Sequence, residues 1–138
     1  MIILDTSGVL AALDARQSQH AEAARVLREP QRRILSPFVL AELDYLISHR
    51  VGEVQARDFL EDVAAGGYEL HPFTSQEVAA ALRIMKRYAD MPLGLADASV
   101  MALADVYGCS TFLTLDERHF RAVLNAEGRP FHLLPQDA

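Results

Sequence analysis

Four acidic residues stand where a carboxylate can take part in chemistry. Asp5 directly follows a short apolar segment near the start of the sequence, and Asp116 follows another near its end. Asp97 stands near the start of an alanine-rich segment, and Glu42 stands among leucine and alanine about one turn after Pro37. Each has an ordinary explanation when it is taken alone, since aspartate caps helices, acids favour the first helical turn and glutamate usually faces water. Any chemistry depends on whether the four carboxylates meet.

Four carboxylates at one place repel one another and raise one another's pKa unless a cation neutralises them. Oxygen ligands that lack a cysteine or histidine motif favour Mg²⁺ or Mn²⁺ over zinc. Such an ion lowers the pKa of a bound water and stabilises charge on the attacking and leaving oxygens of a phosphodiester. The acidic residues therefore predict metal-dependent hydrolysis of phosphodiester bonds.

Hydroxyl and basic side chains lie close to these acids in the sequence. Thr6, Ser7 and Thr114 each lie within two residues of an acid and could orient a carboxylate or a metal-bound water. Helix capping and strand propensity explain these hydroxyls equally well. Arg118 stands two residues after Asp116, where contact with a phosphate group and a solvated helix face are about equally good interpretations. For His119, a local structural role is a better interpretation than proton transfer.

The elements that must position these residues follow from the apolar pattern. Short apolar segments predict strands at residues 2–4, 34–35, 68–70, 111–115 and 131–134. Apolar residues at three- and four-residue spacing predict helices at residues 18–28, 38–51, 53–65, 75–89 and 96–107. Ser36 with Pro37 marks the start of one helix, and Thr74 with Glu77 forms a capping box before another.

Strands that alternate with helices pair in parallel through right-handed crossovers. The sequence therefore predicts an α/β fold, with a mostly parallel central sheet of about five short strands covered by helices on both faces. In such sheets, ligands bind beyond the carboxyl ends of the strands. Asp5 and Asp116 would both lie at that edge.

Length, charge and cysteine content limit the class of protein. The 138 residues predict a single domain spanning residues 1–138. The net charge of −6 argues against a broad basic surface, so phosphates would have to be bound locally by a metal ion and a few arginines. A single cysteine, Cys109, allows no intrachain disulfide, and no apolar run approaches the roughly 18 residues of a membrane span. We expect a cytoplasmic protein that does not associate with a membrane.

The order of the motifs resembles one known family. The segments IILDTS, SPFVLAEL, MPLGLADAS, FLTLDERHF and HLLP are similar to those of PIN-domain nucleases, in particular the VapC-type toxins of bacterial toxin–antitoxin pairs. The resemblance spans nearly the whole chain and implies a PIN-like α/β/α sandwich. It also implies that the four acids form one metal-binding site, with Thr114 close by and Asp90 as a further contributor.

The same resemblance implies an activity and partners. Proteins of this kind are Mg²⁺- or Mn²⁺-dependent endoribonucleases that form homodimers and are held inactive by a small DNA-binding antitoxin. We expect a groove between the helices of residues 18–28 and 38–65 to take up a segment of that antitoxin. An arginine or lysine of the segment would occupy the acidic site in place of metal.

Other aspartate-bearing α/β folds fit the sequence less well. A phosphatase of the haloacid-dehalogenase type needs a second aspartate two residues after the first, where Ser7 stands. A response-regulator receiver needs a close acidic pair near its start, and this pair is absent. The alternatives that stay open are an RNA-processing or DNA-acting PIN nuclease outside a toxin–antitoxin pair, and a metal-binding interaction module without turnover.

Overall fold

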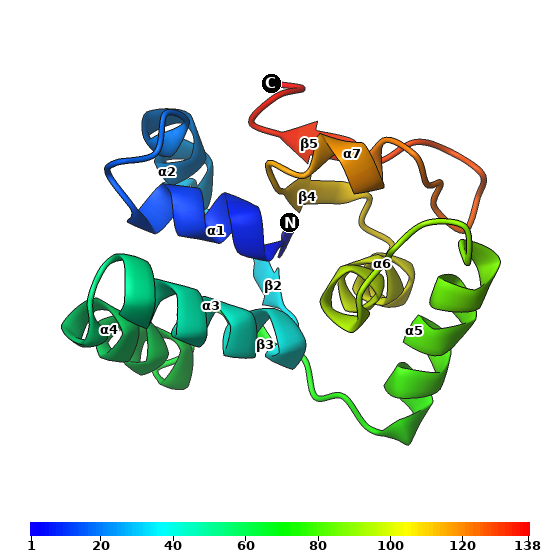
Figure 1. The fold of residues 1–138 in the computed structure, drawn as a ribbon, viewed down its shortest axis with the longest axis horizontal. Helices are drawn as coiled ribbons and strands as arrows, with labels where there is room; N and C mark the ends of the chain where they lie inside the picture. The colour runs from blue at the N-terminus through cyan, green and yellow to red at the C-terminus, as the bar shows by residue number, and fades with distance from the viewer.

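The computed structural model describes all 138 residues (Figure 1). The strands are β1 (Ile2–Leu4), β2 (Arg33–Leu35), β3 (Glu69–Leu70), β4 (Thr111–Leu113) and β5 (His132–Leu134). The helices are α1 (Thr6–Leu13), α2 (His20–Arg28), α3 (Pro37–Arg50), α4 (Glu53–Ala64), α5 (Ser75–Arg87), α6 (Leu95–Tyr107) and α7 (Glu117–Phe120). The predicted strands and the five predicted helices are all present, with ends that differ by up to two residues.

The five strands form one parallel sheet in the order β3-β2-β1-β4-β5. In β1, Ile3 is the register partner of Ile34 on one side and of Phe112 on the other. Strand β4 thus lies beside β1 although more than a hundred residues separate them in the sequence. This adjacency places the ends of β1 and β4, and with them Asp5 and Asp116, at the same edge of the sheet.

Helices cover both faces of the sheet, as the sequence predicts. Figure 1 shows α1 to α4 on one side of the strands and α5 and α6 on the other. All three residues of β1 are completely buried, which is expected for a central strand of a parallel sheet covered on both faces. The buried apolar side chains form one cluster of 34 residues. None of the helices combines the length and apolar character needed to cross a membrane.

Helix α1 is an element that the sequence analysis did not predict. Its residues TSGVLAAL are apolar on nearly all sides and five of the eight are buried, so no helical periodicity shows in the sequence. The helix packs so closely on β4 that a Cβ atom at Gly8 would lie 2.4 Å from the backbone oxygen of Leu113. Only glycine allows this approach. The close packing brings the first turn of α1 against the end of β4, where the candidate site lies.

Candidate active site

The four predicted acids line one cavity beyond the carboxyl ends of β1 and β4. The cavity has a volume of about 650 Å³. Its lining consists of Asp5, Thr6, Ser7, Leu10, Ala41, Glu42, Tyr45, Leu46, Arg50, Asp97 and Asp116. Elements from both faces of the sheet therefore meet at the edge where parallel sheets bind ligands.

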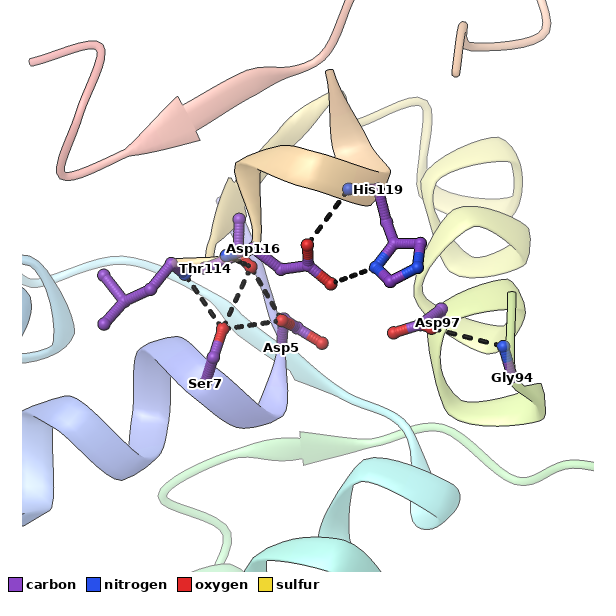
Figure 2. Close-up of polar contacts among 8 residues, drawn as sticks. Asp5, Ser7, Gly94, Asp97, Thr114, Asp116 and His119 are labelled. Atoms are coloured by element: carbon purple, nitrogen blue, oxygen red, sulfur yellow. Dashed lines mark hydrogen bonds and ion pairs between the residues drawn. The ribbon is translucent and has the colours of Figure 1, made fainter. Parts of the chain in front are cut away.

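Asp5 is the most deeply buried of the acids, with 4% of its surface exposed. Its Oδ2 atom accepts hydrogen bonds from the hydroxyl of Thr114 at 2.7 Å and from that of Ser7 at 3.0 Å (Figure 2). Burial raises the pKa of Asp5 from its usual 3.8 to about 6, the two hydroxyls oppose this rise, and the charge of Asp97 adds to it. The fold thus holds a carboxylate where ionisation is unfavourable.

Ser7 and Thr114 connect Asp5 to the end of β4. Besides its bond to Asp5, the Thr114 hydroxyl accepts a hydrogen bond from the backbone N–H of Asp116 at 2.9 Å. The Ser7 hydroxyl accepts one from the backbone N–H of Leu115 at 2.9 Å, and it lies 3.2 Å from the Thr114 hydroxyl. These side chains fix the position of Asp5 relative to Asp116, so they do more than cap a helix or favour a strand.

Asp116 is held by the short helix that follows it. Its Oδ1 atom accepts a hydrogen bond from the backbone N–H of His119 at 3.0 Å, and its Oδ2 atom lies 2.7 Å from Nδ1 of the same residue. Asp116 therefore both caps α7 and lines the cavity, and the two explanations do not exclude each other. His119 has a local role in orienting this carboxylate, while its Nε2 atom is buried without a hydrogen-bond partner.

Asp97 and Glu42 occupy the starts of two helices on opposite faces of the sheet. Asp97 accepts a hydrogen bond from the backbone N–H of Gly94 at 3.2 Å. Burial raises the pKa of Asp97, the bond from Gly94 opposes the rise, and the charges of Asp116 and Glu42 add to it. Glu42 is exposed at the cavity and accepts a hydrogen bond from the Thr6 hydroxyl at 2.6 Å. The charges of Asp116 and Glu42 therefore lie close enough to Asp97 to disfavour its ionisation.

A buried pair of hydroxyls fixes the helices that carry these two acids. Ser36 caps α3 by accepting a hydrogen bond from the backbone N–H of Phe38 at 3.1 Å, as the sequence predicts. Its oxygen also lies 2.7 Å from the hydroxyl of Ser99 in α6, and both serines are completely buried. The contact joins the start of α3 to the first turns of α6, which sets the position of Glu42 relative to Asp97.

Two predicted contributors lie elsewhere, and five lining residues were missed. Asp90 is exposed in the connection between α5 and α6, and Arg118 is exposed on α7; neither lines the cavity. The lining residues that sequence reasoning missed are Leu10, Ala41, Tyr45, Leu46 and Arg50. The last three follow Glu42 on α3 at intervals of three, four and eight residues, a spacing that shares one helix face and could have indicated them. Leu10 lies on the unpredicted helix α1.

The chemistry of the donors fits a hard divalent cation. The acidic lining offers carboxylate oxygens, which Mg²⁺ and Mn²⁺ prefer, and no sulfur or imidazole group lines the cavity. In this structure, no three aspartate, glutamate, histidine or cysteine side chains come close enough together to hold a metal ion. Both oxygens of Asp116 are engaged by His119. The residues fit a metal by donor type and by shared charge, but the side chains are not gathered around one point in this structure.

Comparisons with known proteins agree with this arrangement. The chain matches the PIN domain over residues 2–124. It is 39% identical over 135 residues to Ribonuclease VapC26 of Mycobacterium tuberculosis (strain ATCC 25618 / H37Rv), a match covering 97% of this chain and all of that protein.

Two solved structures share the fold. The crystal structure of Mycobacterium tuberculosis VapC20, described as a Sarcin-Ricin loop cleaving toxin, superposes with a TM-score of 0.81 at 24% identity and covers 94% of this chain and all of that one. VapBC2 from Rickettsia felis, solved bound to a DNA fragment from its promoter, matches with a TM-score of 0.64 at 21% identity, covering 96% of this chain and 97% of that one. By its sequence and its fold, the chain belongs to the PIN domain family, among the VapC-type proteins.

Proposed function

We propose that this protein is a metal-dependent endoribonuclease and the toxin component of a toxin–antitoxin pair. The observation that carries the proposal is the cavity that the desolvated carboxylate of Asp5 shares with Asp97, Asp116 and Glu42, where the charge of Asp97 acts on Asp5 and those of Asp116 and Glu42 act on Asp97. Carboxylates arranged in this way favour a bound cation. The 39% identity to a protein named a ribonuclease supports RNA as the substrate.

Asp5, Asp97 and Asp116 would hold the metal, with Glu42 at the edge of the same site. Mg²⁺ or Mn²⁺ bound there supplies a water of lowered pKa and neutralises charge on the oxygens of the phosphodiester. The residues of the chain supply orientation, since Ser7 and Thr114 direct Oδ2 of Asp5 and thereby fix its other oxygen. His119 fixes Asp116 in the same way.

The proposal includes the partners and the cellular location. An antitoxin would inhibit the enzyme, and two copies of the chain would form a homodimer, which the exposed apolar side chains Val78 and Leu82 on α5 support. A cytoplasmic location follows from an RNA substrate and from a chain whose only cysteine is Cys109. Light scattering of the purified protein, alone and co-expressed with the product of the neighbouring gene, tests both assemblies.

Cleavage of RNA under controlled metal conditions tests the enzymatic part. Total cellular RNA, and a ribosomal RNA fragment containing the sarcin–ricin loop, are incubated with Mg²⁺, Mn²⁺ or EDTA, and the new ends are sequenced. We expect cleavage with metal only, leaving a 5′-phosphate and a 3′-hydroxyl. Asp97→Asn should abolish cleavage, whereas Asp44→Asn, which changes an exposed aspartate of α3 outside the cavity, should not.

Three outcomes would contradict the proposal in different ways. Cleavage in EDTA would exclude the metal. Preference for single-stranded DNA of the same sequence would favour a DNA-acting nuclease. Metal binding by calorimetry without cleavage of any nucleic acid would favour the interaction module.

A further inference from the structure

The cavity has two ends of different chemistry. The acids lie at the end next to the sheet, whereas Tyr45, Leu46 and Arg50 line the cavity along α3, which leads away from the sheet edge. Figure 1 shows α1 and α3 side by side on one face of the sheet. Arg50 stands eight residues after Glu42, a distance of about 12 Å along a helix. The cavity is thus long enough to extend beyond one phosphodiester.

Tyr45 is an aromatic side chain that the fold leaves uncovered. Of the large apolar side chains at the surface it has the largest exposed fraction, 62%. Its ring stacks on the ring of His49, with centroids 4.1 Å apart and an angle of 30° between the planes. Nδ1 of His49 lies 2.7 Å from the backbone oxygen of Tyr45, which fixes the second ring in place. The tyrosine is therefore supported from one side and has ring surface left for another stacking partner.

Arg50 is a cation without a carboxylate partner. The arginines that form ion pairs are Arg16, Arg32, Arg121 and Arg129. Arg50 is exposed, and its backbone oxygen accepts a hydrogen bond from Arg16. A position in the last turn of α3 suits a basic residue because of the helix dipole, but it does not explain why this guanidinium lines the cavity. In a chain of net charge −6, it is a local site for an anion.

We propose that Tyr45 and Arg50 form a nucleotide subsite, in which Tyr45 stacks a base next to the cleaved bond and Arg50 contacts a neighbouring phosphate. The inference rests on the proposed ribonuclease function. Unstacked bases in RNA loops bind aromatic rings in this manner, and guanidinium groups bind phosphates. RNA alternates bases and phosphates along its length. The cavity offers a matching series: a site for a phosphodiester, an aromatic ring and an unpaired cation. The guanidinium would repel the arginine or lysine that an antitoxin segment is expected to bring to the acids.

Tryptophan substitution gives a direct readout of stacking. The chain has no tryptophan, so Tyr45→Trp keeps an aromatic platform and introduces the only indole. The measurement uses an unlabelled, single-stranded 12-nucleotide RNA of mixed sequence, added with Mg²⁺ to the variant in the inactive Asp97→Asn background. We expect this RNA to quench the fluorescence of the indole. The matched control is Val106→Trp on α6, which replaces a side chain of similar exposure, 57%, outside the cavity. Its fluorescence should not change.

Cleavage kinetics and salt dependence test the two residues separately. Tyr45→Leu should lower kcat/KM for RNA about tenfold, mostly through KM, and Tyr45→Phe should restore it. Arg50→Gln should weaken binding of the 12-nucleotide RNA and lower the slope of log affinity against log salt by about 0.7. Arg57→Gln, an exposed arginine of α4 outside the cavity, should change neither. The shift in melting temperature with Mg²⁺ should be the same in all these variants.

The outcomes separate failure of the subsite from failure of the function. If the wild type cleaves RNA and both Tyr45→Leu and Arg50→Gln match it, the subsite is refuted and the nuclease remains. If the wild type does not cleave RNA, quenching of Tyr45→Trp still supports the subsite, and absence of quenching overturns it. If Tyr45→Leu relieves inhibition by the co-expressed antitoxin while RNA cleavage is unchanged, the surface binds polypeptide and the inference is wrong.

Discussion

Replacing Asp5 with asparagine should stabilise the metal-free protein at neutral pH while abolishing its activity. The pKa of Asp5 is raised from 3.8 to about 6, chiefly by burial, so the folded state binds its proton more tightly than the unfolded state. The contribution of the Asp5 carboxyl to the free energy of unfolding is fully present below pH 4 and is lost as pH rises through 6. At about 1.4 kcal/mol per pH unit, the loss reaches roughly 3 kcal/mol at neutral pH.

The asparagine removes this loss but also weakens hydrogen bonds. Both hydroxyls, from Ser7 and Thr114, bond to Oδ2, so one amide oxygen can replace that acceptor. Hydrogen bonds to a neutral acceptor are weaker than bonds to a carboxylate. This weakening offsets about 1 kcal/mol, or somewhat more, of the stability gained by removing the charge. The net gain at pH 7.5 should be about 1–2 kcal/mol, a rise in Tm of roughly 3–8 °C for a chain of this size.

Thermal melts by circular dichroism in EDTA at pH 4, 5, 6 and 7.5 measure the effect. The gain for Asp5→Asn should disappear toward pH 4, where the wild-type carboxyl is protonated in the fold. Asp14→Asn is a control whose effect on Tm should have the opposite sign. The hydrogen bonds from Arg16 lower the pKa of Asp14, so the contribution of this carboxylate to folding stability is lost as pH falls. Millimolar Mg²⁺ should raise the Tm of the wild type more than that of Asp5→Asn. If Asp5→Asn melts below the wild type by the same amount at every pH, the reasoning from burial is refuted.

Three further predictions concern the site and the packing that supports it. Asp97→Asn and Asp116→Asn should each lower the rate of RNA cleavage at least about 10²-fold in steady-state assays, with folding intact by circular dichroism. Gly8→Ala should destabilise the fold by about 1–3 kcal/mol in urea unfolding, since its Cβ would lie 2.4 Å from the oxygen of Leu113, and an unchanged midpoint would show that α1 can shift. Ser36→Ala should cost about 1–3 kcal/mol, because it removes the cap of α3 and the bond to the buried Ser99 hydroxyl, which would keep only its bond to the backbone oxygen of Ala96; a loss under 0.5 kcal/mol would contradict the role of that contact.

The sequence was sufficient for the elements whose apolar pattern has a period. Helices such as α5 carry one apolar face and a capping box, and the strands are short apolar runs between turn residues, so both could be predicted. Helix α1 could not, because it is buried on nearly all sides and its apolar run fits a strand or a helix equally well. The acids could be identified because Asp5 and Asp116 come after predicted strands, and Asp97 and Glu42 lie near the starts of predicted helices.

The interactions among the site residues depend on the order of strands in space. The bonds of Ser7 and Thr114 to Asp5 exist because β4 lies beside β1, and no local pattern reveals that adjacency. The pairing of Asp116 with His119 is different, since three residues separate them and a helical turn suffices. The extension of the cavity along α3 also escaped prediction, because it requires α1 as its opposite wall.

The position of Asp5 between the central strand β1 and helix α1 leaves the protein few ways to relieve its charge. Its backbone N–H bonds to the oxygen of Leu113 in β4, and its backbone oxygen accepts a bond from Val9 in α1, so the residue cannot move outward without breaking the core. A raised pKa of about 6 still leaves the carboxylate mostly ionised at neutral pH. Only a cation brought from outside can then compensate it, either a divalent metal or a basic side chain of a partner. Because both would be drawn to the same carboxylates, we expect Mg²⁺ and an inhibiting antitoxin to compete, with the apparent affinity of the antitoxin falling as the metal concentration rises.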